Sequence, residues 1–327
     1  IEGGVIGRFG SLSPSDSVNT SRYSLSSQWA RKSESKATRV NAYYVRSEFE
    51  LNSDFTNFLN FPTAGDQIQQ KEDRNTWGFN SSRSWFGNFS NLEMENTIGF
   101  QTRYDNVNPI SLSRTQGGVP MAKLDSNGNL WPSTVRRDIL NEYNISFYAE
   151  NRMQWSPWFQ SVIGLRNDFY HFDVDSNLEA NSGKKSDNMT SPKLAFVFGP
   201  WSKTEFYLNG GGGFHSNDAR GITKRVDPNV PTVATRRATP LVRTWGYEVG
   251  FRTGIVQGLQ TTVSLWQLHV DSELLFVGDA GSTVASRPSL RRGIEFTNYW
   301  RPVSWVVIDA DLSFSRARFR GNDPMGN

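Results

Sequence analysis

The chain has 327 residues, of which 36% are hydrophobic and 13% aromatic, and its mean hydropathy is −0.55. It has no cysteine, which excludes a disulfide framework, a Cys-based zinc site and a thiol nucleophile. The 35 Lys and Arg exceed the 32 Asp and Glu by only three. Such a balance does not favour a nucleic-acid partner, which would require a clustered basic face with interleaved aromatics.

The ends of the chain and its apolar content bound the fold class. No run of about eighteen apolar residues is present, so no transmembrane helix is expected. The apolar residues are rich in aromatics, which favours strands. The first residues, "IEGGVIGRF", read as the inside of a strand and the last, "FRGNDPMGN", as a loop, so we expect a fragment of a longer protein.

Alternation of apolar and polar residues predicts thirteen strands. The pattern is clearest in "LEMENTIGFQTRYD", where Ile98, Phe100 and Tyr104 share one face and Gln101 and Arg103 the other. The predicted strands are 3–9, 20–31, 37–51, 73–86, 92–105, 139–152, 158–175, 190–199, 203–215, 242–252, 266–274, 289–301 and 306–315.

The predicted connections alternate between short and long. Short ones are "KSESKA", "GNFSN", "SPW", "GPW", "GIVQG" and "RPVSW". Long ones are expected at 52–72, 106–137, 176–189, 216–241 and 278–288. This predicts an up-and-down antiparallel meander with the tight turns at one end and the long loops at the other.

A soluble sandwich or lipocalin-like barrel also has half-buried alternating strands, but three features favour a membrane barrel. Many strands reach ten residues or more, enough to cross a bilayer at a tilt. Thirteen strands joined only to their sequence neighbours cannot fold into one small soluble barrel, whereas in lipid they would close into a barrel. Aromatic residues cluster beside the tight turns, as in a membrane-interface girdle: Trp85, Phe86, Trp155, Trp158, Trp201, Trp300 and Trp305.

The predicted fold is therefore all-β: residues 1–327 form part of a transmembrane up-and-down antiparallel β-barrel with charged side chains facing its lumen. Bacterial barrels of this kind have even strand numbers. A 22-stranded barrel would need roughly 550 residues, so about 13 of its strands would be present here.

With strands and loops placed, "SPKLAFVFGPWSKTEFYLNGGGGFHSNDARG" at 191–221 resembles the strand, periplasmic turn, strand and loop entry of TonB-dependent outer-membrane receptors. Three further segments are similar to strand hairpins of that family: "WSPWFQSVIGLRNDFY", "WGYEVGFRTGIVQGLQTTVSLWQLHVDSELLFVGDAG" and "RRGIEFTNYW". The resemblance spans almost the whole chain and is most specific over 145–315.

The resemblance implies an energised importer in the outer membrane of a Gram-negative bacterium. Its 22-stranded barrel would be occluded by a plug that contacts TonB, and it would take up an iron chelate, cobalamin, a glycan or a similar small molecule. Outer-membrane lipid and lipopolysaccharide are further expected partners. No plug or TonB-contacting box is recognised in this sequence, so the resemblance assigns no residue to coupling.

The stretch "NGGGGFHSNDARG", residues 209–221, invites comparison with a phosphate-binding loop. It lacks the spacing of such a loop, because the sixth residue from Gly210 is His215 and no Lys follows. Alternation instead places it at the outer end of a strand, where the glycines let the backbone bend into the next loop.

Ligand contacts are expected from polar-face residues near the outer strand ends and at the loop mouths. The candidates are Arg103, Asp105, Asp168, His215, Asp218, Arg220, His269, Asp271 and Glu273. No catalytic residue, metal site or cofactor is predicted: none of His171, His215 and His269 has a metalloprotease spacing, and no Gly-x-Ser-x-Gly elbow is present.

Three arginine pairs, Arg136–Arg137, Arg236–Arg237 and Arg291–Arg292, lie in or beside the predicted long loops. We expect them to be solvated loop charges; the alternative is contact with lipopolysaccharide phosphates or an anionic ligand. For the whole chain, the alternative to an energised receptor is a passive porin of about sixteen to eighteen strands. A third class is a non-transport protein, either an outer-membrane enzyme or a soluble scaffold.

Overall fold

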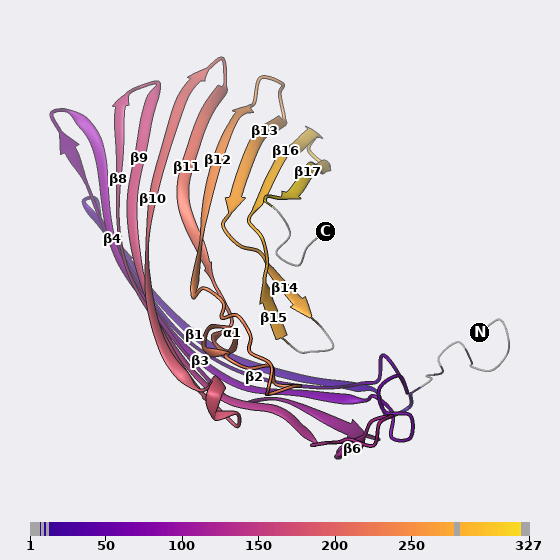
Figure 1. Ribbon diagram of the computed structural model, residues 1–327. Coiled ribbons are helices and arrows are strands. Elements are labelled where there is room, and N and C mark those ends of the chain that lie inside the picture. Colours follow the sequence, from indigo (N-terminus) through magenta and orange to yellow (C-terminus); the bar gives the residue numbers. More distant parts are fainter. Residues whose placement is uncertain (1–6, 8–9, 11–12, 278–281, 322–327) are drawn as a thin grey trace.

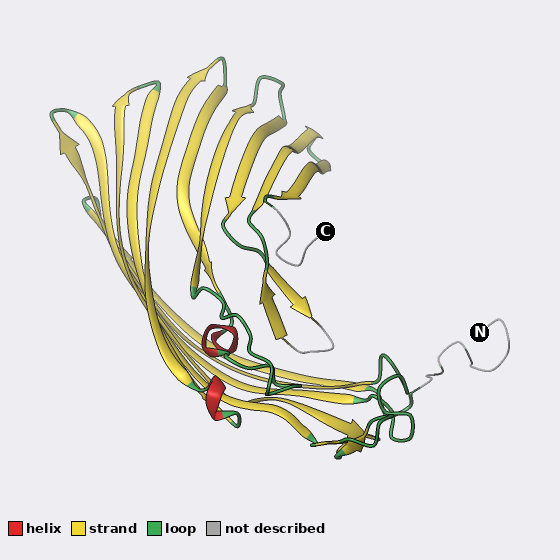
Figure 2. Cartoon of the chain, viewed as in Figure 1, coloured by secondary structure: helices red, strands yellow, loops and turns green. Residues whose placement is uncertain are grey.

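The computed structural model describes residues 7, 10, 13–277 and 282–321, and it is almost wholly antiparallel strand (Figures 1 and 2). The main strands are β1 (Ser17–Lys32), β2 (Lys36–Ser53), β3 (Ile68–Phe89), β4 (Leu92–Gln116), β8 (Thr134–Ser156), β9 (Phe159–Ser176), β10 (Gly183–Trp201), β11 (Thr204–Ser216), β12 (Leu241–Thr253), β13 (Leu259–Val270), β16 (Ser289–Val303) and β17 (Val306–Phe319). Short elements are β5 (Val119–Pro120), β6 (Lys123–Leu124), β7 (Leu130–Trp131), η1 (Glu179–Asn181), α1 (Ala219–Thr223), β14 (Leu274–Val277) and β15 (Ser282–Ala285).

The twelve main strands pair in sequence order into one sheet, from β1 to β17, and β5 pairs with β4. They correspond to twelve of the predicted strands; the partial strand expected at 3–9 falls almost entirely outside the described residues. The sheet curves without closing, so each of β1 and β17 has one strand neighbour in the described part of the chain (Figure 1). We call its concave face the inner face and its convex face the outward face.

Strands extend beyond the alternating segments, most of all on the N-terminal side of the sheet. β3 has 22 residues and β4 has 25. The loop-side end of β3 carries charges on both faces in the run Lys71–Arg74, so hydropathy alternation is lost there although the backbone remains paired. The connections between β2 and β3 and between β4 and β8 are correspondingly shorter than the sequence suggested.

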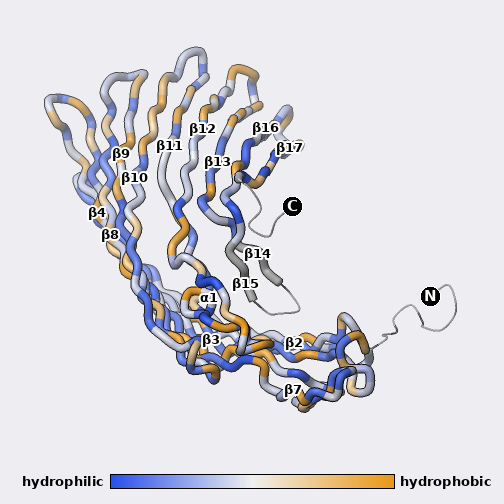
Figure 3. Tube along the Cα trace, viewed as in Figure 1, coloured by the Kyte–Doolittle hydropathy of each residue, from blue (hydrophilic) through white to orange (hydrophobic). Residues whose placement is uncertain are grey.

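Apolar and polar residues alternate along the strands (Figure 3), and large apolar side chains are exposed on the outward face. Ile98, Phe147 and Leu165 each expose about half of their surface there. Such exposure in a soluble protein would be an aggregation hazard, but it suits contact with lipid. No helix in the described ranges is long and apolar enough to cross a bilayer.

Two rows of rings border this apolar surface. One lies near the tight turns, where Trp158 and Trp201 stack at 6.1 Å. The other, which was not predicted from the sequence, is a ladder of cross-strand neighbours from β2 to β9: Tyr44, Trp77, Tyr104, Tyr143 and His171. Tyr143 and Trp155 are twelve residues apart on β8, about 28 Å for a strand tilted by about 45°, close to the height of the apolar band of an outer-membrane barrel.

The four glycines 210–213 mark the place where β11 separates from β10. β10 pairs with β11 only as far as Gly211, whereas β11 and β12 stay paired up to Ser216. Beyond this point β11 and β12 leave the sheet and bend over its inner face (Figure 1). On the outward side the glycines also make room for rings, because a Cβ on Gly212 would lie 3.2 Å from Pro192 and 3.4 Å from Trp245.

The loop after β11, residues 217–240, continues inward; we call it the inward loop. Its helix α1 lies against the inner face of the sheet (Figure 1). Ala219 and Ile222 of α1 join Leu241 in a buried apolar cluster with residues of the sheet: Val107, Ile110, Leu140, Phe172, Val174 and Met189. The main hydrophobic core of the described chain is therefore formed between the sheet and this loop.

The register corrects the predicted faces of β13. Leu265 pairs with Val249, and both are about half exposed on the outward face. Consequently Trp266, Leu268 and Val270 lie on the inner face, and the residues that alternate with them, among them the candidate His269, do not. Alternation could not show this because β13 has apolar residues on both faces.

Candidate functional site

Four of the nine candidate residues gather with neighbours into one group on the inner face, which we call the inner charge cluster: Glu72, Arg74, Arg103, Asp105, Glu142, Asp218 and Arg220. Strands β3, β4 and β8 supply its wall. The carboxylate of Asp105, 4% exposed, accepts hydrogen bonds from Arg103 at 2.6 and 2.8 Å and from Thr76 at 2.7 Å. Arg74 links Asp105 at 3.4 Å to Glu72 at 2.6 Å.

The inward loop supplies the opposite side of the cluster. Asp218 caps the N-terminus of α1 by accepting from the Arg220 amide at 2.9 Å, and its carboxylate also accepts from Arg220 Nε at 2.9 Å. Burial by itself would raise the pKa of Asp218, but the ion pair and hydrogen bonds with Arg220 outweigh burial and lower it. Asp218 is therefore ionised whenever the loop is docked at neutral pH.

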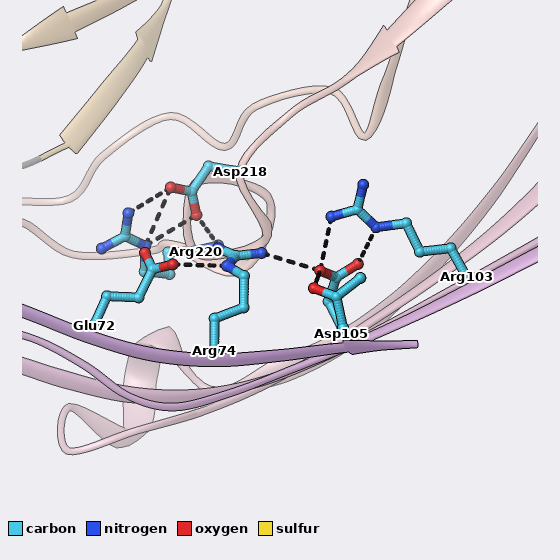
Figure 4. A network of polar contacts seen from close by, with 7 residues as sticks. Glu72, Arg74, Arg103, Asp105, Asp218 and Arg220 are labelled. Carbon is cyan, nitrogen blue, oxygen red and sulfur yellow. Dashed lines mark hydrogen bonds and ion pairs between the residues drawn. The ribbon is translucent and has the colours of Figure 1, made fainter. Parts of the chain in front are cut away.

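The two sides enclose a cavity of about 230 Å³. Glu72 and Arg74 rise from the sheet toward Asp218 and Arg220, with Arg103 and Asp105 beside them (Figure 4). The cluster offers both carboxylates and guanidinium groups, so it can donate to and accept from a polar ligand. Within the described ranges, no group of three or more His, Asp or Glu side chains is arranged to hold a metal ion.

The remaining candidates do not join this cluster. Asp168 is buried nearer the tight-turn end, where it is held by Arg166 at 2.8 Å and by the Ser146 hydroxyl. Glu273 accepts from Arg291 at 2.6 Å and from Ser289, and its carboxylate lies within electrostatic reach of His215.

His269 faces the other way from the predicted lumen position. It pairs with Trp245, on the face shared by Tyr247 and Leu265, so it lies on the outward face. Its Nε2 is 3.2 Å from Asp271, which follows the end of β13. The error has the same origin as that for β13, since alternation alone did not fix which face of this strand is inner.

The arginine pairs fall into different environments. Arg236 and Arg237 are exposed on the inward loop, in keeping with solvated charge. Arg136 is instead 5% exposed on β8, with its Nε 3.3 Å from Asp138, so for this residue the expectation was wrong. Arg220, Asp218 and Asp227 of the inward loop lie within electrostatic reach of it. The local sequence does not encode this proximity.

Sequence reasoning missed Glu72, Arg74 and Glu142 as members of the inner charge cluster. Glu72 and Arg74 lie in the charged run where alternation of hydropathy fails. In the two-residue repeat of a strand, Glu72 and Arg74 share one face and Lys71 and Asp73 share the other, so opposite charges lie next to each other on each face. This pattern would have pointed to Glu72 and Arg74. Glu142 lay on the predicted polar face of its strand, and only the register places it near Asp105.

The sequence profile of one family, described as "TonB dependent receptor-like, beta-barrel", matches residues 3–327. The chain belongs to this family. TonB-dependent receptors are transport proteins of the Gram-negative outer membrane rather than enzymes, as the resemblance noted from the sequence implied. No curated protein matches the chain in sequence.

Solved structures of TonB-dependent receptors share the fold at low sequence identity. The ferric yersiniabactin uptake receptor FyuA from Yersinia pestis matches with a TM-score of 0.68 and 11% identity over 94% of this chain and 44% of its own. The ferric citrate transporter FecA matches with 0.68 and 12% over 95% and 44%, and the copper transporter OprC with 0.64 and 15% over 92% and 47%. The chain thus spans less than half the length of these receptors.

Proposed function

We propose that the chain is the barrel portion of an outer-membrane receptor that imports a metal chelate and is energised through TonB. The observation that carries the proposal is the inner face: within a barrel sheet of the TonB-dependent receptor family, the inward loop and the sheet enclose a cavity lined by charged side chains. An energised importer must bind its ligand tightly at low concentration, and such groups can provide the contacts. A passive porin conducts without tight binding.

The partners follow from the same proposal. The neighbouring receptors are described as uptake proteins for ferric yersiniabactin, ferric citrate and copper, which supports a small metal chelate as the ligand. TonB would act through a plug domain elsewhere in the protein. The apolar outward face and its aromatic rows support contact with outer-membrane lipid, and we include lipopolysaccharide among the expected lipids.

The test is uptake by metal-depleted cells. Strains with and without the gene are supplied in turn with radiolabelled ferric citrate, a ferric hydroxamate, a ferric catecholate and a copper chelate. We expect deletion to abolish uptake of one of them and removal of TonB to have the same effect. Unchanged uptake of every chelate, or uptake that persists without TonB, would refute the proposal.

The inner charge cluster can be tested in the same assay. Arg103→Gln removes two hydrogen bonds to Asp105 from the inner face, and we expect it to raise the KM of uptake severalfold. Arg292→Gln is the matched control, because Arg292 lies on the outward face and donates to Gln267. Equal effects of the two substitutions would remove Arg103 from the ligand site.

A further inference from the structure

A second cavity, of about 460 Å³, lies between the loops 54–67 and 117–133; we call it the loop pocket. It is formed at the outer ends of β2, β3, β4 and β8, and Asn229 of the inward loop also lines it. It shares no lining residue with the cavity of the inner charge cluster. None of the nine candidate residues contributes to it.

The floor of the loop pocket is a buried guanidinium group. Arg114 is 6% exposed, and its charge lies 4.9 Å from the ring centre of Trp131 and 5.8 Å from that of Phe61. Its hydrogen bonds go to neutral acceptors, the Pro132 carbonyl at 2.9 Å and Asn229 Oδ1 at 3.2 Å. These use two of the five N–H groups that an arginine can donate.

The carboxylates that line the pocket are occupied by their own loops. Asp66 accepts from the Thr56 hydroxyl and from the Asn60 and Phe61 amides, so it shapes the turn of the loop 54–67. Asp125 likewise accepts from Asn129 and from the Trp131 indole, and these bonds lower its pKa to about 2.

A second buried cation, Lys123, lies near Asp66. Lys123 is 1% exposed, and its ammonium donates to the carbonyls of Gly65 and Gln67. It lies 5.5 Å from the Phe61 ring centre and within electrostatic reach of Asp66. Lys123 offsets the charge of Asp66. In the described part of the chain Arg114 has no carboxylate at ion-pair distance, and its side chain donates only to neutral acceptors.

The rim of the pocket is apolar and exposed. Phe55 and Leu59 line it and expose 81% and 74% of their surface, although they are large hydrophobic side chains. An apolar rim above a buried guanidinium is complementary to an anion carried on a flat apolar body. Such a ligand would cover the rim, while its carboxylate used the remaining donors of Arg114.

From this arrangement we propose that the loop pocket binds an aromatic carboxylate, with Arg114 as the anion anchor and Phe55 and Leu59 as the apolar clamp. This inference rests on the proposed function, because it takes the aromatic carboxylate to be part of the imported chelate. The pocket would then capture the ligand at the loops, before it reaches the inner charge cluster.

The binding test uses the full-length receptor solubilised in detergent and a small probe, 4-fluorobenzoate, whose binding is followed by ¹⁹F line broadening. We expect saturable binding to the wild type and at least tenfold weaker binding to Arg114→Met, with Arg292→Met unchanged. 4-Fluorobenzamide, which has the same shape without the charge, should bind at least tenfold more weakly than the acid. Equal binding of the acid and the amide, or of wild type and Arg114→Met, would overturn the proposal.

Because Arg114 also holds Pro132 and Asn229, its loss could loosen the loops, so a second variant is needed. Phe55→Ser alters an exposed rim residue, and we expect it to weaken binding severalfold. Phe58→Ser is the matched control, since Phe58 is 61% exposed on the same loop but does not line the pocket. Equal effects of Phe55→Ser and Phe58→Ser would contradict the proposal that Phe55 contacts the ligand in the loop pocket.

The two proposals fail separately. Absence of probe binding in a protein that still supports TonB-dependent uptake refutes the loop pocket alone. Saturable, Arg114-dependent binding in a protein that supports no uptake refutes the proposed function alone.

Discussion

Several tyrosine rings of the inner face lie directly over glycines of the neighbouring strand. Tyr148 covers Gly99 in this way, and a Cβ built on Gly99 would lie 2.1 Å from the ring carbon Cζ. The same relation joins Tyr43 to Gly78 and Tyr207 to Gly250. These glycines are therefore required by close approach of a ring, in strands where glycine otherwise weakens the sheet.

Gly99→Ala should destabilise the folded protein by about 1–3 kcal/mol, because the added methyl must displace the Tyr148 ring. The measurement is guanidinium unfolding of the protein in detergent, followed by the heat-modifiable shift on electrophoresis. Gly87→Ala is the control, since nothing lies within 4 Å of its added Cβ. If Gly99→Ala were as stable as Gly87→Ala, the Tyr148 ring would move aside without a loss of unfolding free energy, contrary to this prediction.

At the scale of elements, the inward loop is held by apolar contacts of α1 and by the ion pair within it. The side chains of Asp218 and Arg220 are 24% and 13% exposed, so the pair is largely shielded from water. Removing one partner leaves the other charge poorly compensated. The docked position of the loop should therefore depend on this pair.

Asp218→Asn should weaken docking by about 1.5–3 kcal/mol, the range for hydrogen bonds to charged groups. Hydrogen exchange of the peptide 217–240 should then accelerate, because Ile222 and Ala238 lose protected amide bonds. Asp173→Asn is the control: its pair with Lys184 is exposed on the outward face, so no change in exchange is expected. Identical exchange in Asp218→Asn and the wild type would mean that apolar contacts alone hold the loop.

The difference in hydrogen exchange between the wild type and Asp218→Asn should depend on pH with a defined sign. Since the pKa of Asp218 is lowered in the folded protein, its contribution is fully present above the ordinary aspartate value of about 3.9 and is lost as the pH falls through the lowered pKa. After correction for intrinsic exchange, wild type and Asp218→Asn should differ between pH 5 and 8 and converge in acid. A difference that persists below the lowered pKa would exclude this carboxylate as its cause.

At the scale of the whole molecule, the sheet is open, and β1 and β17 each present one edge without a strand partner in the described residues. Unpaired backbone groups cost several kcal/mol each in hydrocarbon, so a membrane sheet must close. The polypeptide 1–327 expressed alone should consequently form no stable pore in a planar bilayer. A heat-modifiable, detergent-stable monomer with steady conductance would contradict this expectation.

The sequence by itself determined the strands, their order and the end of the sheet at which the tight turns lie. These properties are local: alternation reports the two-residue repeat of a strand, and a short connection between such strands forces an antiparallel neighbour. The bend at Gly210–Gly213 could also be anticipated, because the backbone freedom of glycine is a local property.

Only the tertiary structure decided the inner face of β13, the outward position of His269, the burial of Arg136 and the two cavities. Each of these depends on contacts between segments far apart in the chain. Arg114 and Asn229 are separated by more than a hundred residues, and the inward loop packs against sheet residues as distant in sequence as Val107. The loop sequence 217–240 carries no periodic signal of its docking, because a single turn of helix and a few apolar contacts position it.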